Sequence, residues 1–230
     1  MSAIFITATG TDVGKTFLAA SLIRHFRQIG RAVHAIKPVV SGFDPAQIEA
    51  SDPGVLLSAL GLPVTMEEVE RISPWRFRAP LSPDTAAARE GRRIDVDQVI
   101  ACCKSAVAQH RGILLIEGIG GIMVPLDARR TVLDVLTALR LPLILVTGSY
   151  LGTISHTLTA IDALLRRDMD LLATIVSETP GSTVPLEDVV SSIANFAEPV
   201  IGLPRGRPGT APNLDDLFSS QRALDMMNLG

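Results

Sequence analysis

Short apolar runs alternate with longer amphipathic segments along most of the chain. Six runs, each four to six residues long, predict buried strands at residues 3–8, 32–36, 113–116, 143–146, 171–176 and 199–203. Strands that alternate with helical segments are typical of β–α units on a mostly parallel sheet. The pattern therefore predicts an α/β fold with helices on both faces of the sheet.

Two helical segments are clear from the spacing of apolar positions. The first covers residues 16–28 and ends before Gly30. The second covers residues 95–110, which contain both cysteines of the chain. Its apolar positions at helical spacing are Val96, Val99, Ile100, Cys103 and Val107. Buried packing is therefore the expected role of the cysteines, and a catalytic thiol is not expected.

The pattern is less regular between Pro38 and Gly91, where prolines are frequent. Residues 38–52 predict a long loop, and a loop of that length in a compact domain is usually functional. Beyond residue 206, a tail rich in proline and glycine holds one short helical candidate at residues 214–227. We expect a single domain over residues 1–230, with this tail peripheral to it.

The composition narrows the classes of function. The formal net charge is −3 and no block of like charges occurs, so neither nucleic acid nor a membrane surface is an expected partner. The longest apolar stretch, near residues 141–146, is too short to span a bilayer. We expect no targeting leader, because the N-terminal residues enter the first predicted strand without a basic region and a long apolar run. Cys102 and Cys103 are adjacent and cannot form a disulfide framework, which favours a reducing, cytoplasmic location.

A phosphate-binding motif follows the first predicted strand. The sequence ATGTDVGKT places Gly10 and Gly14 in a loop, after which Lys15 and Thr16 open a helix. The backbone N–H groups of such a loop and the helix N-terminus attract phosphate. Lys15 is expected to reach the outer phosphates of a nucleotide and the Thr16 hydroxyl to bind Mg²⁺. Thr9 stands where the common motif has its first glycine, so the loop is a variant P-loop.

Two charged residues end other predicted strands at the same rim of the sheet. Glu117 follows strand 113–116, at the end of the strand where open α/β sheets bind ligands. Lys37 follows strand 32–36 and would add a second cation where charge develops during phosphoryl transfer. Taken alone, Glu117 is equally typical of an ordinary strand end, and Lys37 of an exposed surface. The nearby P-loop favours the functional interpretation of both residues.

Six motifs together resemble the dethiobiotin synthetases in order and spacing. They are Thr11-Asp12-Val13-Gly14-Lys15-Thr16, Lys37-Pro38-x-x-Ser41-Gly42, Ser51-Asp52, Ala79-Pro80-x-Ser82-Pro83, Glu117-Gly118-x-Gly120-Gly121 and Leu151-Gly152-Thr153-Ile154-Ser155-His156. The resemblance covers residues 3–205, and the combination of Lys37-Pro38 with Ser41-Gly42 discriminates best.

The resemblance implies a homodimeric, ATP- and Mg²⁺-dependent ligase of biotin biosynthesis with a P-loop NTPase-like fold. Enzymes of this family join CO₂ to diaminopelargonate. An amine of the substrate becomes a carbamate, the γ-phosphoryl group of ATP moves to the carbamate, and the second amine closes a ureido ring. The protein supplies no covalent nucleophile, so its task is positioning and charge stabilisation.

The resemblance also implies a role for each matching residue. Lys37, Lys15 and Thr11 would be catalytic, and Thr16, Asp52 and Glu117 would hold Mg²⁺. The substrate would contact Ser41, Thr11, Lys37, Ser82, Gly152, Thr153 and Ser155, with the loop from Gly152 to Ser155 contributed by the other subunit. The nucleotide would contact Asp12, Val13, Gly14, Lys15, Thr16, Phe17, Asp52, Glu117, Gly118, Ile119, Gly120, Ser177 and Pro204.

Several positions depart from the family pattern. Ser177-Glu178 stands where an Asn-Asp pair often contacts the adenine. Tyr150 replaces a frequent lysine, Ser155 a frequent asparagine, and Asp84 a histidine. These departures bear on base selectivity and substrate affinity, not on the type of reaction.

Three other functions fit this P-loop chain less well. A partitioning or switch ATPase of the same branch has a lysine at the position of Gly10 followed by two glycines, whereas this chain has Gly10-Thr11-Asp12. An amidating synthetase of the cobyrinate type needs a glutaminase domain with a catalytic cysteine, for which 230 residues leave no room. A nucleotide sensor without chemistry has no use for Lys37.

Overall fold

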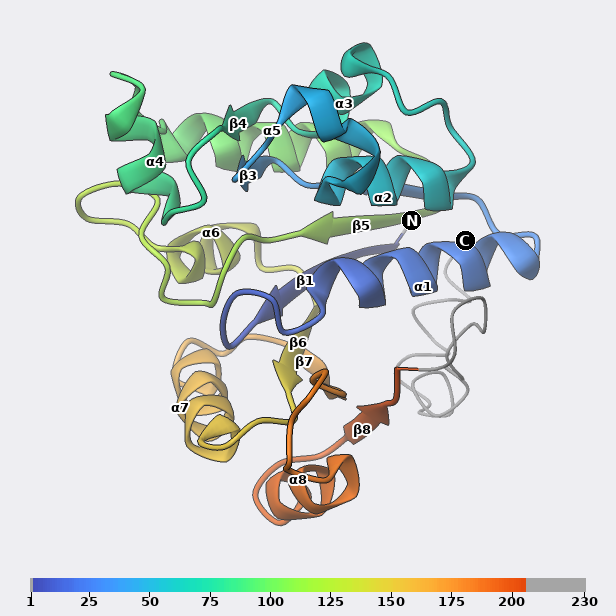
Figure 1. Cartoon of the computed structure of the whole chain (residues 1–230), viewed down its shortest axis with the longest axis vertical. Coiled ribbons are helices and arrows are strands. Elements are labelled where there is room, and N and C mark those ends of the chain that lie inside the picture. Colours follow the sequence, from blue (N-terminus) through green and yellow to red (C-terminus); the bar gives the residue numbers. More distant parts are fainter. Residues whose placement is uncertain (1, 206–230) are drawn as a thin grey trace.

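The computed structural model describes residues 2–205 and has helices on both sides of a parallel sheet (Figure 1). The strand order is β2-β5-β1-β6-β7-β8, and all neighbouring strands are parallel. The strands are β1 (Ser2–Ala8), β2 (Val33–Ile36), β5 (Ile113–Glu117), β6 (Leu143–Gly148), β7 (Leu171–Ser177) and β8 (Val200–Leu203). These bounds confirm the six predicted strands to within two residues.

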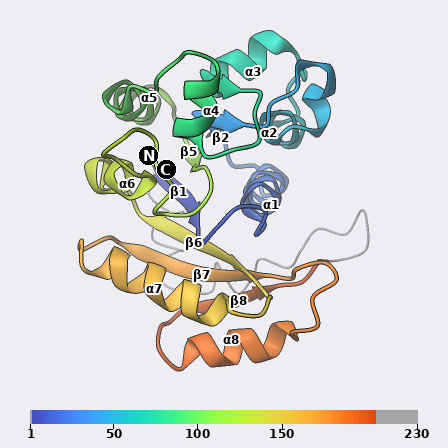
Figure 2. The ribbon, with the colours of Figure 1, turned by 60° about the vertical axis from the view of Figure 1, so that its left-hand side comes forward.

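Strands β5 and β6 are buried at every position, as expected for the centre of a sheet covered on both faces. Helix α1 (Lys15–Gln28) packs against β1, β2 and β5, and α2 (Asp52–Leu60) packs on α1 and β2. Figure 2 shows α5 (Val96–Gln109) and α6 (Val132–Leu139) on the side of the sheet opposite α1.

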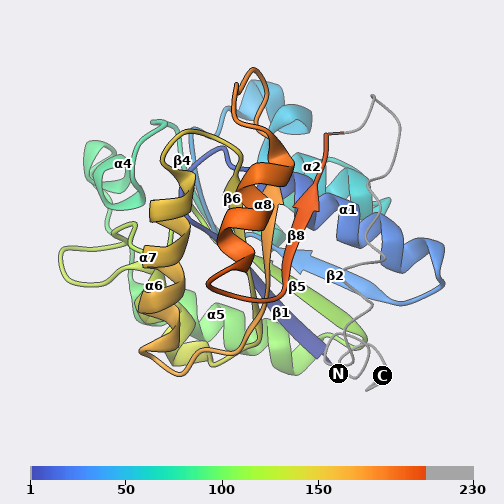
Figure 3. The same ribbon diagram turned by 90° about the horizontal axis from the view of Figure 1, so that it is seen from below.

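Helices α7 (Thr153–Leu165) and α8 (Leu186–Ala194) cover the other end of the sheet. Helix α7 contacts β6, α8 contacts β7 and β8, and the two helices contact each other. Figure 3 shows both helices in front of these strands. The two helices predicted from apolar spacing, α1 and α5, are confirmed to within one residue at each end.

The prediction of a long loop at residues 38–52 is wrong, because this segment contains a short strand and a 3₁₀ helix. Strand β3 (Val39–Ser41) pairs in parallel with β4 (Trp75–Phe77), and a 3₁₀ helix covers Pro45–Ala50. Elements this short carry no readable periodicity. The Ser51 side chain then accepts a hydrogen bond from the Gly54 N–H and begins α2. Helices α3 (Met66–Ile72) and α4 (Pro83–Arg89) complete this region.

The register of the central strands brings the C-terminal ends of β1, β2 and β5 together at one rim of the sheet. Ile36 of β2 pairs with Ile116 of β5, so Lys37 comes beside Glu117. Glu117 in turn pairs with Ile6 of β1, which leads into the predicted P-loop. The predicted helix at residues 214–227 lies outside the described part of the chain. Within residues 2–205, no helix has both the length and the apolar character needed to cross a membrane.

Candidate active site

A cavity of about 830 Å³ lies at this rim, between the segments that follow β1, β2 and β5. Many residues that the sequence marked as functional line it: Thr11, Asp12, Gly14, Lys15, Thr16, Phe17, Lys37, Ser41, Asp52, Ser82, Ile119 and Gly120. Sequence reasoning missed five further lining residues: Val40, Ala50, Leu81, Val124 and Arg205. The structure thus joins motifs that are far apart in the sequence into one site.

The P-loop wraps the start of α1. Gly14, the residue before the helix, has φ 104°, which a residue with a Cβ rarely adopts. A Cβ on Gly14 would also lie only 2.5 Å from the Ser177 Oγ. Glycine is therefore required here both by the backbone and by the close approach of β7. The free N–H groups of the first turn of α1 offer a site for phosphate.

Lys15 is buried, and its Nζ donates a hydrogen bond to the Gly10 carbonyl at 2.8 Å. Burial and the nearby Lys37 ammonium lower the pKa of Lys15 to about 8. The described residues give its ammonium a carbonyl partner but no direct ion pair. A bound phosphate would supply the missing counter-charge.

Lys37 lies at the centre of a charged cluster. It is 2% exposed, and its Nζ is 2.5 Å from both the Asp52 Oδ2 and the Glu117 Oε1. The Thr16 hydroxyl donates to the same Glu117 Oε1 at 2.6 Å. Burial opposes the charged form of Lys37, but Glu117 and Asp52 outweigh it and raise the pKa of Lys37. Likewise, burial opposes the charged form of Asp52, but Lys37 outweighs it and lowers the pKa of Asp52.

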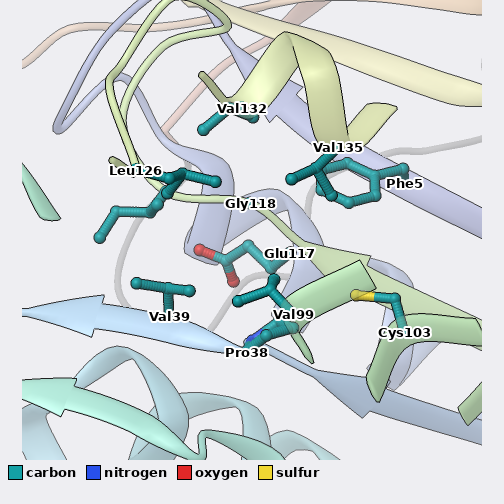
Figure 4. Close-up of a pocket in the computed structure, with 11 residues that line it drawn as sticks. Phe5, Pro38, Val39, Val99, Cys103, Glu117, Gly118, Leu126, Val132 and Val135 are labelled. Atoms are coloured by element: carbon teal, nitrogen blue, oxygen red, sulfur yellow. The ribbon is translucent and has the colours of Figure 1, made fainter. Parts of the chain in front are cut away.

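Apolar side chains hold Glu117 from behind (Figure 4). The small cavity there, about 20 Å³, is lined by Phe5, Pro38, Val39, Val99, Cys103, Glu117, Gly118, Ile119, Leu126, Val132 and Val135. The second oxygen of the carboxylate, Oε2, has no hydrogen-bond partner among the described residues. Both hydrogen bonds to the Glu117 carboxylate therefore go to its first oxygen, Oε1, from Thr16 and Lys37. Burial raises the pKa of the Cys103 thiol to about 12, which agrees with a packing role.

Three oxygen-bearing side chains in this cluster suit a hard cation. Thr16 and Glu117 are in direct contact, and Asp52 reaches the same lysine. Hydroxyl and carboxylate oxygens are the ligands that Mg²⁺ prefers. Within residues 2–205, no group of three or more His, Cys, Asp or Glu side chains could hold a metal by itself. The donor set therefore fits Mg²⁺ that keeps waters and phosphate oxygens as further ligands.

Some predicted nucleotide contacts lie beside the cavity rather than on its wall. Val13 is buried under the loop, and Gly118 lines the small cavity behind Glu117. Ser177 is also buried, with its Oγ against Gly14 and no hydrogen-bond partner among the described residues. Pro204 is exposed and directly precedes Arg205, which lines the cavity and whose N–H donates to Glu178.

The predicted substrate contacts from the sixth motif do not line the cavity of this chain. Gly152 caps α7, and the buried Thr153 hydroxyl donates to the Gly148 carbonyl at 2.6 Å. Ser155 is exposed on the first turn of α7. Leu151, just before them, is 92% exposed. None of these residues therefore lines the cavity of its own chain, although the Thr153 hydroxyl is linked through Thr147 to the Thr9 hydroxyl at the start of the P-loop.

Two of the positions that depart from the family pattern also lie outside the cavity. Asp84 lines a separate surface hollow with the arginines Arg92, Arg93, Arg129 and Arg130. The Tyr150 hydroxyl contacts the His156 Nδ1 at 2.9 Å.

Comparisons with known proteins agree with this geometry. A family model described as an AAA domain matches residues 2–213. An "ATP-dependent dethiobiotin synthetase BioD" of Methylobacterium nodulans is 49% identical, over 94% of this chain and 98% of the relative. A protein of the same name from Phenylobacterium zucineum is 43% identical, over 97% of this chain and 98% of the relative.

Solved structures support the fold at lower identity. The septum site-determining protein MinD of Pyrococcus horikoshii, complexed with Mg-ADP, has a TM-score of 0.54 at 19% identity, over 99% of this chain and 93% of that one. The receptor FtsY of Elizabethkingia anophelis has a TM-score of 0.52 at 16% identity, over 98% of this chain and 65% of that one. These likenesses show a P-loop NTPase fold and nothing finer. The sequence relatives, which match over nearly their whole length, show that the chain belongs to the dethiobiotin synthetase family.

Proposed function

We propose that this chain joins CO₂ to 7,8-diaminopelargonate, with ATP and Mg²⁺, to form dethiobiotin. The observation that carries the proposal is the cluster of the buried Lys37 and Glu117 with Thr16 and the half-exposed Asp52, beside the P-loop. A protein that only binds nucleotide has no need of a buried second lysine at this point. Relatives of the same name, aligned over nearly their whole length, support the assignment.

The protein must stabilise the negative charge that the carbamate and the transferred phosphoryl group carry during the reaction. One amine adds CO₂ and loses a proton to become a carbamate. A carbamate oxygen then bonds to the γ-phosphorus as the bond to ADP breaks, and the second amine finally displaces phosphate to close the ring. Lys15 and Lys37 border the cavity where these negative charges would lie, and so are placed to stabilise them. Bound Mg²⁺, held by Thr16, Asp52 and Glu117, would neutralise phosphate charge.

Positioning of the reactants falls to the other lining residues. The hydroxyls of Thr11, Ser41 and Ser82 reach the cavity from three separate segments and can hydrogen-bond the substrate. Asp12 to Phe17 and Ile119 to Gly120 border the nucleotide side. Two reactive groups held at once in such a site react with far less entropic cost than in solution.

We further propose that the active unit is a homodimer. Gly152, Thr153 and Ser155 lie outside the cavity of their own chain, so a substrate role for them requires a second copy. Leu151 next to them is 92% exposed and is therefore open to contact with a second copy. The free thiols of Cys102 and Cys103 suit a reducing, cytoplasmic compartment.

The test is substrate-dependent phosphate release. The parent protein should release phosphate from ATP only when diaminopelargonate and bicarbonate are both present, with formation of dethiobiotin. Lys37→Gln should lower kcat by about 10²–10³-fold, the scale for one lost electrostatic stabiliser, without weakening ATP binding. Lys104→Gln, a change of the exposed lysine on α5, is the matched control and should behave as the parent. A rate of ATP hydrolysis that does not depend on diaminopelargonate would favour a switch ATPase instead.

A further inference from the structure

The charges of the site balance within the protein itself. Two lysines, Lys15 and Lys37, face two carboxylates, Asp52 and Glu117, and the other two charged residues that line the cavity, Asp12 and Arg205, are one of each sign. The Lys37 ammonium lies between the two carboxylates, within 2.5 Å of each. Those carboxylates are also the proposed ligands of Mg²⁺. We propose that Lys37 occupies the cation position of the nucleotide-free enzyme and excludes Mg²⁺ until a nucleotide binds, a proposal that rests on the function proposed above.

The contacts of Glu117 leave little room for a second cation. Its Oε1 accepts hydrogen bonds from both the Thr16 hydroxyl and Lys37. Its Oε2 is buried and has no hydrogen-bond partner among the described residues, and apolar side chains surround the carboxylate in Figure 4. Glu117 is 1% exposed, so its carboxylate is closed off from water. A metal ion can therefore reach this carboxylate only if Lys37 gives up its contact.

The charges of the site also disfavour binding of Mg²⁺ in the absence of a nucleotide. A divalent cation added to a neutral cluster would leave two uncompensated positive charges beside Lys15 and Lys37, in a partly desolvated site. The described protein donors also fall short of a full ligand set, and Mg²⁺ loses its waters reluctantly. Nucleotide phosphates change both conditions, because they bring negative charge and further oxygen ligands. They also give Lys37 a new anionic partner in the cavity that it lines.

This arrangement links the arrival of the nucleotide to the release of the catalytic lysine. While Lys37 bridges Asp52 and Glu117, its ammonium is unavailable to a carbamate. Once phosphates and metal take over the carboxylates, Lys37 is free to face the substrate side of the cavity. The order of binding is therefore nucleotide with metal, and not metal alone.

Manganese binding without nucleotide tests the proposal. Mn²⁺ is titrated into the protein and free Mn²⁺ is measured by electron paramagnetic resonance. Lys37→Met should bind Mn²⁺ at least about tenfold more tightly than the parent, because one unit of competing charge is removed from the cluster. Lys104→Met should match the parent, since Lys104 is exposed on α5. Lys15→Met should gain less than Lys37→Met, because Lys15 bonds to the Gly10 carbonyl and not to a carboxylate.

A second titration, with ADP present, gives an internal comparison. The advantage of Lys37→Met over the parent should then shrink to within about threefold, because Lys37 has already left the carboxylates. An equal or weaker affinity for Mn²⁺ in Lys37→Met without nucleotide would overturn the proposal. Diamine-dependent turnover by the parent would still stand in that case, so failure of the inference is separable from failure of the proposed function.

A measurement on the parent protein covers the case of a variant that does not fold. The chain has three lysines, Lys15, Lys37 and Lys104, so ¹⁵N-lysine labelling gives a simple spectrum. The chemical shift of the Lys37 ammonium group should not change when Mg²⁺ is added alone, and it should change when ADP and Mg²⁺ are added together. A full shift with Mg²⁺ alone would contradict the proposed exclusion.

Discussion

At the scale of single residues, the two lysines of the site are held in opposite ways. Lys37 has two carboxylate partners, which raise its pKa. Lys15 has a carbonyl partner, and burial lowers its pKa to about 8. Above that pH, Lys15 is mostly neutral in the free protein. A nucleotide phosphate beside it would favour the charged form and so raise its pKa again.

We therefore expect proton uptake when a nucleotide binds at alkaline pH. At pH 9, binding of metal-free ADP should take up about one proton per site, and at pH 6.5 Lys15 should contribute none because it is already charged. Calorimetric titration in buffers of different ionisation enthalpy measures the uptake. Lys15→Met should abolish it, whereas Lys104→Met should retain it. A parent protein that binds ADP at pH 9 without proton uptake would refute the lowered pKa of Lys15.

The charged residues of the site were predictable from the sequence, whereas several other residues that line the cavity were not. Lys15, Lys37 and Glu117 each follow a buried strand at one rim, and the geometry of parallel sheets brings such positions together. Val124 and Arg205 also line the cavity, but each comes from a loop whose path depends on tertiary packing. No local pattern marks residues of that kind.

At the scale of secondary structure, long periodic segments were predictable and short ones were not. The six strands and the helices α1 and α5 carry clear apolar patterns, and all are confirmed. Between Pro38 and Gly91 the elements are short, and strand β3 has only three residues. Prolines start several of them, including α2 and α4, where the fixed φ of proline suits the first helical turn. Here proline marked helix starts rather than loops.

The start of α1 offers a test of how strictly the P-loop is built. Gly14→Ala should lower both the melting temperature and the affinity for nucleotide. The alanine would have to adopt the positive φ of this position, and its Cβ would lie 2.5 Å from the Ser177 Oγ. Backbone strain alone costs about 1–2 kcal/mol in this conformation. Thermal unfolding and ADP titration measure the two effects.

A matched control is Gly30→Ala at the other end of the same helix. Gly30 also has a positive φ, 72°, but nothing lies within 4 Å of its added Cβ. It should lose about 1–2 kcal/mol of stability and leave ADP affinity unchanged. Ser177→Gly should restore part of the loss in Gly14→Ala, since it removes the atoms that collide. Equal losses in the Gly14 and Gly30 variants would show that the contact with Ser177 does not matter.

At the scale of the whole molecule, the cavity and the sixth motif lie apart. The P-loop, Lys37 and Glu117 meet at one rim, whereas Gly152 and Ser155 begin α7 and line no part of that cavity. The surface of the described chain near α7 also carries Leu151, which is almost fully exposed. A second copy that brings this surface to the cavity would explain both features. The family resemblance assigned the motif to the site of the other subunit, whereas the apolar pattern alone carries no information about the cavity that the motif serves.

The exposed Leu151 therefore makes assembly of the chain testable. The parent protein should sediment as a dimer, and Leu151→Glu should shift it towards the monomer by weakening association about 10²-fold or more. The estimate follows from about 1.5 kcal/mol or more for each of two buried leucines. Leu165→Glu, at the far end of α7 and 57% exposed, is the control and should leave the dimer intact. In Leu151→Glu the KM for diaminopelargonate should rise, while the affinity for ADP stays within a few-fold because the P-loop belongs to one chain. A parent protein that turns over fully as a monomer would remove the partner subunit from the substrate site.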